Sequence, residues 1–266
     1  MKITSSTNPR IKELVKLREA KARRERGLTI VDGIREVSRA VEAGAAVKEL
    51  YVCPELYEGQ GQGNVAEVIT KVSSRKIPVY DISSEIFQKV AFGERAEGVL
   101  AVCQPKLSTL GDIKKKKDCL LMIVEAVEKP GNLGAILRTC DAAGVDALLV
   151  SGHSTDIFNP NVIRASLGTV FTVPVVQADP KDIVTFLKKN QVKIFATTPD
   201  TSKIYTKSDL RGSVAIIVGS EKEGLSGFWL DHADVKISIP MKGKADSLNA
   251  AVTAAVVAYE AVRQRT

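Results

Sequence analysis

The sequence predicts an α/β protein of two domains, in which a small α/β domain precedes a larger, mostly parallel sheet covered by helices on both faces. The chain has 266 residues, enough for two domains, and 44% of them are hydrophobic. Short apolar runs alternate with helical segments in two successive series. Between the two series stands a run of four lysines, Lys114–Lys117. We therefore expect a first domain over 1–106, a lysine-rich linker over 107–117 and a second domain over 118–266.

The first domain is expected to begin with an amphipathic helix over Pro9–Arg26, because Ile11, Leu14 and Val15 fall on one side of it. Short apolar strands and helices then alternate. The strands are predicted at Leu28–Val31, Glu49–Cys53, Pro78–Ile82 and Gly98–Cys103, and the helices at Gly33–Ala43, Val65–Ser73 and Ser84–Val90. The glycine-rich run over 58–63 is predicted to be a loop.

The second domain repeats this alternation with stronger strands. They are predicted at Cys119–Val124, Ala147–Val150, Thr172–Val176, Val192–Ala196, Val214–Val218 and Val235–Ile239. The helices are predicted at Asn132–Ala143, Pro160–Leu167, Pro180–Asn190, Ser226–His232 and Ser247–Arg263. This order is typical of a parallel sheet with helices on both faces. Such sheets bind ligands at the carboxyl ends of their strands, so the loops that follow the strands are where we expect the chemistry.

The charge of the chain indicates an anionic partner without identifying it. The net charge is +7 at pH 7, and the segment from Arg10 to Arg26 holds eight basic residues against three acidic ones. A solvated helix face and a segment that follows nucleic-acid phosphates both fit this distribution. On the second interpretation, the candidate nucleic-acid contacts are Arg10, Lys12, Arg18, Arg23 and Arg24.

The sequence argues against several other classes of protein. It has no apolar run of membrane-spanning length and no signal-peptide-like start, so we expect no membrane partner and a cytoplasmic location. Its four cysteines form no CxxC pair, and its two histidines, His153 and His232, are isolated. We therefore expect neither a disulfide framework nor a bound metal. The P-loop, HExxH, GxSxG and GxGxxG motifs are absent as well.

The loop after Cys119–Val124 carries polar residues that folding alone does not explain. Its Pro-Gly-Asn turn is expected to start a helix with Asn132 as the cap. Arg138 follows near the middle of that helix, among apolar neighbours. Two roles for Arg138 remain open, a partly buried ion pair with Asp141 and a fork that binds phosphate.

Two later loops also carry unexplained polar residues. After Val214–Val218, glycines bracket a charged turn that contains Glu221, so backbone groups there can face a ligand. After Val235–Ile239, either Asp246 or Ser247 is expected to cap the last helix. Capping does not explain Asn249, which offers both a donor and an acceptor.

At these three loops the sequence closely resembles the SpoU (TrmH-like) family of RNA ribose 2′-O-methyltransferases, within the SPOUT superfamily. The matching stretches are Glu128–Thr139, Ile217–Leu225 and Ile237–Met241 with Ser247–Asn249, in the order and spacing of the family. Many members have an aspartate where this chain has Glu128-Lys129. Through Ser6–Lys12 and the region of Gly33, the first domain resembles the ribosomal-protein-like RNA-binding domain that many members carry.

The resemblance implies a fold, a reaction and a set of site residues. It implies a trefoil knot in the second domain, a homodimer formed through that domain, and methyl transfer from S-adenosylmethionine to a ribose 2′-hydroxyl of structured RNA, ribosomal rather than transfer RNA. The positions that match the catalytic site are Asn132, Arg138, Glu221, Ser247 and Asn249. The positions expected to hold the cofactor are Thr197, Thr198, Gly219, Ile239, Met241 and Leu248.

Three questions stay open at this level. The enzyme could act on transfer RNA, or the chain could be a catalytically silent RNA-binding or ribosome-assembly protein with the same fold. Arg138 could act as a general base or as a phosphate anchor, and its pKa, which for a free guanidinium is roughly 12.5 or higher, favours the anchor.

Overall fold

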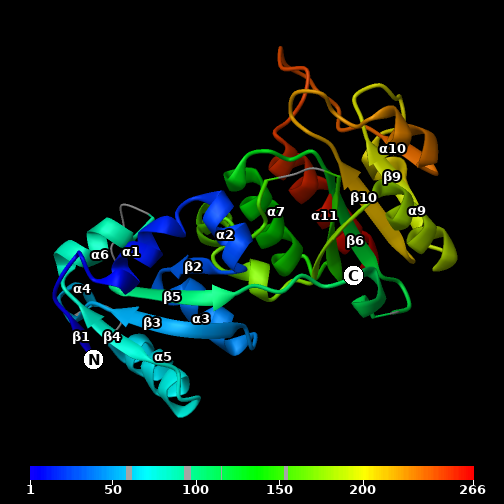
Figure 1. Cartoon of the computed structure of the whole chain (residues 1–266). Coiled ribbons are helices and arrows are strands. Elements are labelled where there is room, and N and C mark those ends of the chain that lie inside the picture. Colours follow the sequence, from blue (N-terminus) through cyan, green and yellow to red (C-terminus); the bar gives the residue numbers. More distant parts are fainter. Residues whose placement is uncertain (58–61, 93–96, 115, 153–154) are drawn as a thin grey trace. The chain divides into compact units, whose positions relative to one another are not determined.

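The computed structural model consists of two compact units (Figure 1). Unit 1 comprises Met1–Lys106 together with Asp156–Thr172, and unit 2 comprises Leu107–Thr155 together with Val173–Thr266. The structure describes residues 1–57, 62–92, 97–114, 116–152 and 155–266. Residues 58–61 of the predicted loop, Lys115 of the lysine run and His153 lie outside the described residues.

Unit 1 is built on a mixed five-stranded sheet with the order β1-β4-β3-β5-β2. The strands are β1 (Lys2–Ile3), β2 (Thr29–Asp32), β3 (Ala46–Val52), β4 (Val79–Ile82) and β5 (Val99–Gln104). β4 pairs in parallel with β1 and β3, whereas β5 runs antiparallel to β2 and β3. The two-residue strand β1 was not predicted, because it is too short to show an apolar period.

Helices pack around this sheet. They are α1 (Pro9–Lys16), α2 (Ala20–Arg26), α3 (Ile34–Glu42), α4 (Pro54–Tyr57), α5 (Gln62–Ser74), α6 (Ser84–Val90) and, from the second segment of the unit, α8 (Pro160–Ala165) with the 3-10 turn η2 (Thr169–Phe171). Several polar contacts hold the second segment in place, and two of them involve β2. The Thr29 hydroxyl donates to the Phe158 carbonyl at 2.7 Å, and Arg164 pairs with the buried Asp32 carboxylate at 3.1 Å. Burial raises the pKa of Asp32, because a carboxylate loses hydration there.

The prediction of one helix over Pro9–Arg26 was wrong, since the chain forms α1 and α2 with a break between them. Glu19 is extended at the break, with ψ of 134°. The Arg23 guanidinium donates to the carbonyls of Leu17 and Arg18, at 3.0 and 2.8 Å, and so satisfies groups that the end of α1 leaves without helical partners. A buried side chain therefore replaces the hydrogen bonds that a continuous helix would have made.

Unit 2 is built on a six-stranded sheet with the order β11-β9-β10-β6-β7-β8, in which every pair is parallel. The strands are β6 (Leu120–Glu125), β7 (Ala147–Ser151), β8 (Val175–Ala178), β9 (Lys193–Thr197), β10 (Val214–Val218) and β11 (Val235–Ile237). The predicted strand Thr172–Val176 is displaced toward the C-terminus, because the 3-10 turn η2 occupies Thr169–Phe171 and Pro174 precedes β8.

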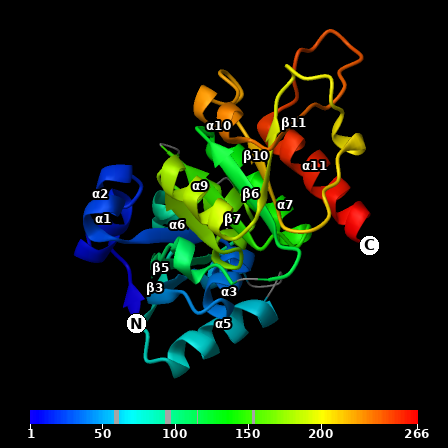
Figure 2. The same ribbon diagram turned by 90° about the vertical axis from the view of Figure 1, so that its right-hand side faces the viewer.

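Helices cover both faces of this sheet, as Figure 1 shows. They are α7 (Pro130–Ala142), α9 (Pro180–Lys189), α10 (Gly227–His232) and α11 (Ala250–Arg265), with the 3-10 turns η1 (Leu110–Asp112) and η3 (Tyr205–Lys207). Apolar side chains of α9 and α10, among them Ile183 and Trp229, pack in one core with Leu121 and Ile123 of β6. Helices α7 and α11 pack against each other on the other face (Figure 2).

The cysteines of the chain are not cross-linked. All four cysteines are free and buried, and burial raises the pKa of Cys103 and Cys140 to about 12, so neither thiol is reactive near neutral pH. None of the helices in the described ranges is both long enough and apolar enough to cross a membrane.

Candidate functional site

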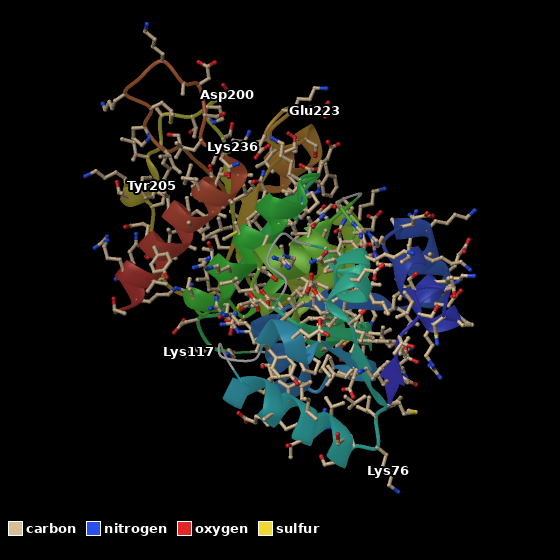
Figure 3. All side chains as sticks on the ribbon, turned by 90° about the vertical axis from the view of Figure 1, so that its left-hand side faces the viewer. Lys76, Lys117, Asp200, Tyr205, Glu223 and Lys236 are labelled. Atoms are coloured by element: carbon tan, nitrogen blue, oxygen red, sulfur yellow. The ribbon has the colours of Figure 1, made fainter. Side chains whose placement is uncertain are left out.

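The parallel sheet of unit 2 brings the three polar loops together. β11, β9, β10 and β6 are consecutive neighbours, so the loops that leave their carboxyl ends meet at one edge of the sheet. A cavity of about 330 Å³ lies among the loops that follow β9, β10 and β11. Figure 3 shows two of its lining residues, Asp200 and Glu223, at one end of unit 2, with Lys117 of the linker at the other.

All six residues that were predicted to hold a cofactor line this cavity. They are Thr197, Thr198, Gly219, Ile239, Met241 and Leu248. Glu221 and Ser247, from the predicted catalytic set, line it as well. The cavity is also lined by residues that the sequence did not single out, among them Pro199, Asp200, Leu230 and Thr253. Asp200 could have been noted, because it lies two residues after Thr198 in the same strand-end loop.

The backbone around the cavity is fixed by short hydrogen-bonded turns. The Thr197 hydroxyl donates to the Ile217 carbonyl at 2.8 Å, which ties the end of β9 to β10. Ser220 and Gly224 exchange two backbone hydrogen bonds of 3.1 Å, which close the loop after β10. A Cβ at Gly219 would lie 2.2 Å from the Gly224 carbonyl oxygen, so this loop can close only if residue 219 is glycine.

A network of side chains joins three of the predicted catalytic residues. The Nδ2 groups of Asn132 and Asn249 both donate to Oε1 of Glu221, the second over 2.6 Å. Asn249 Nδ2 also lies 3.2 Å from Asn132 Oδ1. Lys129 Nζ contacts the other Glu221 oxygen, Oε2, at 2.8 Å. The network therefore connects the start of α7, the loop after β10 and the start of α11.

Both predicted helix caps were wrong, and the correction explains this network. Lys129 is the residue that precedes α7, and Pro130 is its first helical residue. Asn132 thus lies in the first turn, and its side chain reaches Glu221 instead of its own backbone. At α11 the cap is Asn249, whose Oδ1 accepts from the backbone of Ala251 and Val252 at 2.9 and 3.4 Å. Capping therefore uses the acceptor of Asn249 and leaves its donor for Glu221.

Arg138 stands apart from the network. It is exposed in the middle of α7 and makes no hydrogen bond or ion pair with any residue that the structure describes. It lies six positions after Asn132, which corresponds to about 9 Å along a helix axis. The partly buried ion pair with Asp141 is therefore not formed, and the guanidinium is available to a ligand.

Some basic residues at the start of unit 1 already have a partner inside the protein, and others are exposed without an ion-pair partner among the described residues. Arg23 was predicted to bind RNA, but in the structure it is only 5% exposed and its guanidinium pairs with Asp156 at 2.8 Å, so this side chain is engaged within unit 1. Arg10 pairs with Glu49, and Arg18 donates to two backbone carbonyls. Lys12 and Arg24 are exposed and have no ion-pair partner in the described part of the chain.

The described residues contain no group of three or more His, Cys, Asp or Glu side chains arranged to hold a metal. His232 has a structural role, since its ring stacks on Phe228 and its Nδ1 is 2.8 Å from the Phe228 carbonyl. The side-chain network of the site consists of the amides of Asn132 and Asn249, the carboxylate of Glu221 and the ammonium group of Lys129, a set that can orient a hydroxyl group and bind phosphate.

Comparison with known proteins assigns both parts of the chain. Residues 119–259 match the SpoU rRNA Methylase family, and residues 8–101 match the MRM3-like substrate binding domain. The chain is 31% identical over 260 residues to the 23S rRNA (guanosine(2553)-2′-O)-methyltransferase RlmP of Bacillus subtilis, covering 97% of both chains.

Solved structures agree along the whole length. A crystal structure of an RNA 2′-O ribose methyltransferase matches with a TM-score of 0.87 and 38% identity, over 100% of this chain and 99% of that one. The AdoMet-bound rRNA methyltransferase from Sinorhizobium meliloti matches with a TM-score of 0.91 and 28% identity, over 100% and 98% of the two chains.

Proposed function

The chain belongs to the SpoU rRNA Methylase family, and on that premise we propose that it methylates a ribose 2′-hydroxyl of 23S ribosomal RNA. It is an enzyme, and its methyl donor is S-adenosylmethionine. The observation that carries the proposal is the meeting of the ligand-sized cavity and the Asn132–Glu221–Asn249 network at one edge of the sheet in unit 2. The whole-length similarity to a 23S rRNA enzyme favours ribosomal RNA over transfer RNA as the substrate.

The cavity fits a small cofactor. Its volume of about 330 Å³ falls in the range of small-molecule sites, roughly 300–1,000 Å³. Apolar side chains such as Ile239 and Leu248 can cover an adenine ring, and the carboxylates of Asp200 and Glu223 can attract the positively charged part of the donor. S-adenosylmethionine, when bound, supplies an electrophilic methyl group on a sulfonium centre.

The residues of the chain have to orient the ribose hydroxyl and hold the RNA. The amides of Asn132 and Asn249 carry the donors and acceptors that can fix the direction of a 2′-hydroxyl, and Glu221 holds both amides in place. Ser247 lines the cavity, and we assign it to contact with the donor or the ribose. We assign Arg138 to the phosphate beside the target ribose, because its guanidinium is exposed and has no hydrogen-bond or ion-pair partner among the described residues.

Unit 1 is proposed to select the RNA. Its match to a substrate binding domain supports this role, and Lys12 and Arg24 are the exposed cations of its first helices that have no ion-pair partner in the described part of the chain. The predicted boundaries of 1–106 and 118–266 are kept as the proposed RNA-binding and catalytic domains. Residues 156–172 are an addition to the first, because they pack in unit 1. An rRNA substrate fits the predicted cytoplasmic location.

The homodimer and the trefoil knot are also proposals. On helix α11, Val252 is 47% and Tyr259 is 50% exposed. The two residues are seven positions apart and so lie on one face, which supports burial against a second copy.

The end of α11 is attached to the segment before β10. Gln264 contacts the backbone of Ser208 and Leu210, and Arg265 contacts the carbonyls of Leu210 and Gly212. This attachment is consistent with a knotted C-terminus.

The proposed function is tested by incubating the protein with labelled S-adenosylmethionine and RNA from cells that lack the protein. We expect label in 23S rRNA. Label in transfer RNA alone would support the tRNA alternative. An absence of label from every RNA, although the cofactor binds, would support the silent RNA-binding alternative.

A further inference from the structure

The residue that precedes α7 is unfavourable for the helix that it begins. Lys129 makes no side-chain hydrogen bond to the backbone of α7. Serine, threonine, asparagine or aspartate at such a position would accept a hydrogen bond and stabilise the helix by about 1 kcal/mol. A cation there is also unfavourable, because the N-terminus of a helix carries partial positive charge. Helix formation therefore does not explain why lysine stands at this position.

The contacts of Lys129 offer an explanation. Its ammonium group lies 2.8 Å from Glu221 Oε2, on the loop that follows β10. The other oxygen of the same carboxylate, Oε1, accepts from the amides of Asn132 and Asn249. The contact with Glu221 raises the pKa of Lys129, which keeps the side chain protonated. One carboxylate is thus held by three groups, and Lys129 is the one that carries a full charge.

We propose that Lys129 is a positioning residue for methyl transfer, which fixes Glu221 so that its second oxygen remains the shared acceptor of Asn132 and Asn249. This inference rests on the proposed function. Without Lys129, the carboxylate could rotate, and the two amides that depend on it would lose their common acceptor. Lys129 also neutralises Glu221 at the place where RNA phosphates approach, where an uncompensated carboxylate would repel them.

The two effects are separated by measuring RNA affinity and the single-turnover rate independently. Lys129→Met keeps the length of the side chain and removes its charge. At saturating RNA and S-adenosylmethionine we expect the single-turnover rate to fall about 3- to 10-fold, below the roughly 10²-fold that a misplacement of 1 Å can cause. The RNA affinity should fall most at low salt, where repulsion from Glu221 is least screened. Lys129→Arg should restore the rate, because arginine also pairs with a carboxylate.

Two comparisons make the test decisive. Lys189→Met removes the same charge from an exposed position at the end of α9, away from the cavity, and should change neither quantity. In a Glu221→Gln background, Lys129→Met should cause no further loss of the single-turnover rate, because the carboxylate that Lys129 fixes is gone.

The inference is overturned if Lys129→Met turns over at the wild-type rate, or if it slows single turnover in the Glu221→Gln background as much as it does in the wild type. A wild-type protein without any methyl transfer would overturn the proposed function instead, so the two failures are distinguishable.

Discussion

Asn249 performs two tasks with two ends of one amide, and substitutions can separate them. Its Oδ1 caps α11 through the backbone of Ala251 and Val252, and its Nδ2 donates to Glu221 at 2.6 Å. Asn249→Ala removes both functions. Asn249→Ser keeps a good capping oxygen, since serine and asparagine cap equally well, but it removes the donor to Glu221.

The expected magnitudes follow from these contacts. Loss of the cap in Asn249→Ala should lower the free energy of unfolding by about 1 kcal/mol, which for a chain of this size lowers the melting temperature by about 2–4 °C. Asn249→Ser should melt within about 1 °C of the wild type. Both variants lose the donor, and we expect both to reduce the single-turnover rate about 10²-fold, as the loss of one positioned donor does in other enzymes.

Calorimetry of the three proteins and single-turnover methylation of 23S rRNA measure the two effects. Cofactor affinity serves as the control for the integrity of the cavity. The reasoning would be refuted if Asn249→Ser kept the wild-type rate, because the amide donor would then have no role. Equal melting of Asn249→Ala and the wild type would remove the argument for the cap.

Three further predictions concern the remaining polar residues. Arg138→Ala should abolish methyl transfer while melting and cofactor affinity stay unchanged, because this side chain is exposed and has no internal partner among the described residues; an active variant would refute its role as phosphate anchor. Lys12→Ala combined with Arg24→Ala should weaken RNA binding and reduce its salt dependence, and an unchanged salt slope would mean that the two cations only face solvent. Arg23→Ala should instead mainly destabilise the protein, because it leaves Asp156 without its buried partner. The pairing with Arg263 lowers the pKa of Glu260 to about 2, so the ion pair stabilises the fold above the ordinary pKa of 4.5, and this stability is lost as the pH falls from 4.5 toward 2. Glu260→Gln should flatten the pH dependence of the unfolding free energy in this window, and an unchanged profile would show that the ion pair does not stabilise the fold.

The spacing of apolar residues predicted most helices and strands, because it shows which side chains are buried. In unit 2 the buried runs coincide with the strands. The prediction failed where a distant side chain decides the local structure. The break between α1 and α2 depends on Arg23, which reaches back to two carbonyls and across to Asp156, 133 residues away in sequence. No local pattern contains that contact, so the sequence alone could not show that Arg23 is engaged within unit 1. The packing of Asp156–Thr172 in unit 1 depends on similar long-range contacts, such as that of Arg164 with Asp32.

The site was located from strand-end loops and motifs, but the partners within it were not. Asn132 and Asn249 were singled out, yet Asn132 was expected to cap a helix and Asn249 was not. Capping preferences favour the same residue types that bind ligands, so the sequence alone does not assign them. Lys129 was noted only as a departure from the family, because its partner Glu221 lies on a loop 92 residues further along the chain.

The central claim is that the product carries its methyl group on a ribose 2′-oxygen of 23S rRNA. The most direct test digests 23S rRNA from cells with and without the protein to nucleosides, identifies the modified one by mass spectrometry, and maps its position. The account predicts one 2′-O-methylated nucleoside that disappears with the protein, and that returns when the wild type is supplied but not with Arg138→Ala. A methyl group found on a base, or 23S rRNA identical in the two strains, would contradict it.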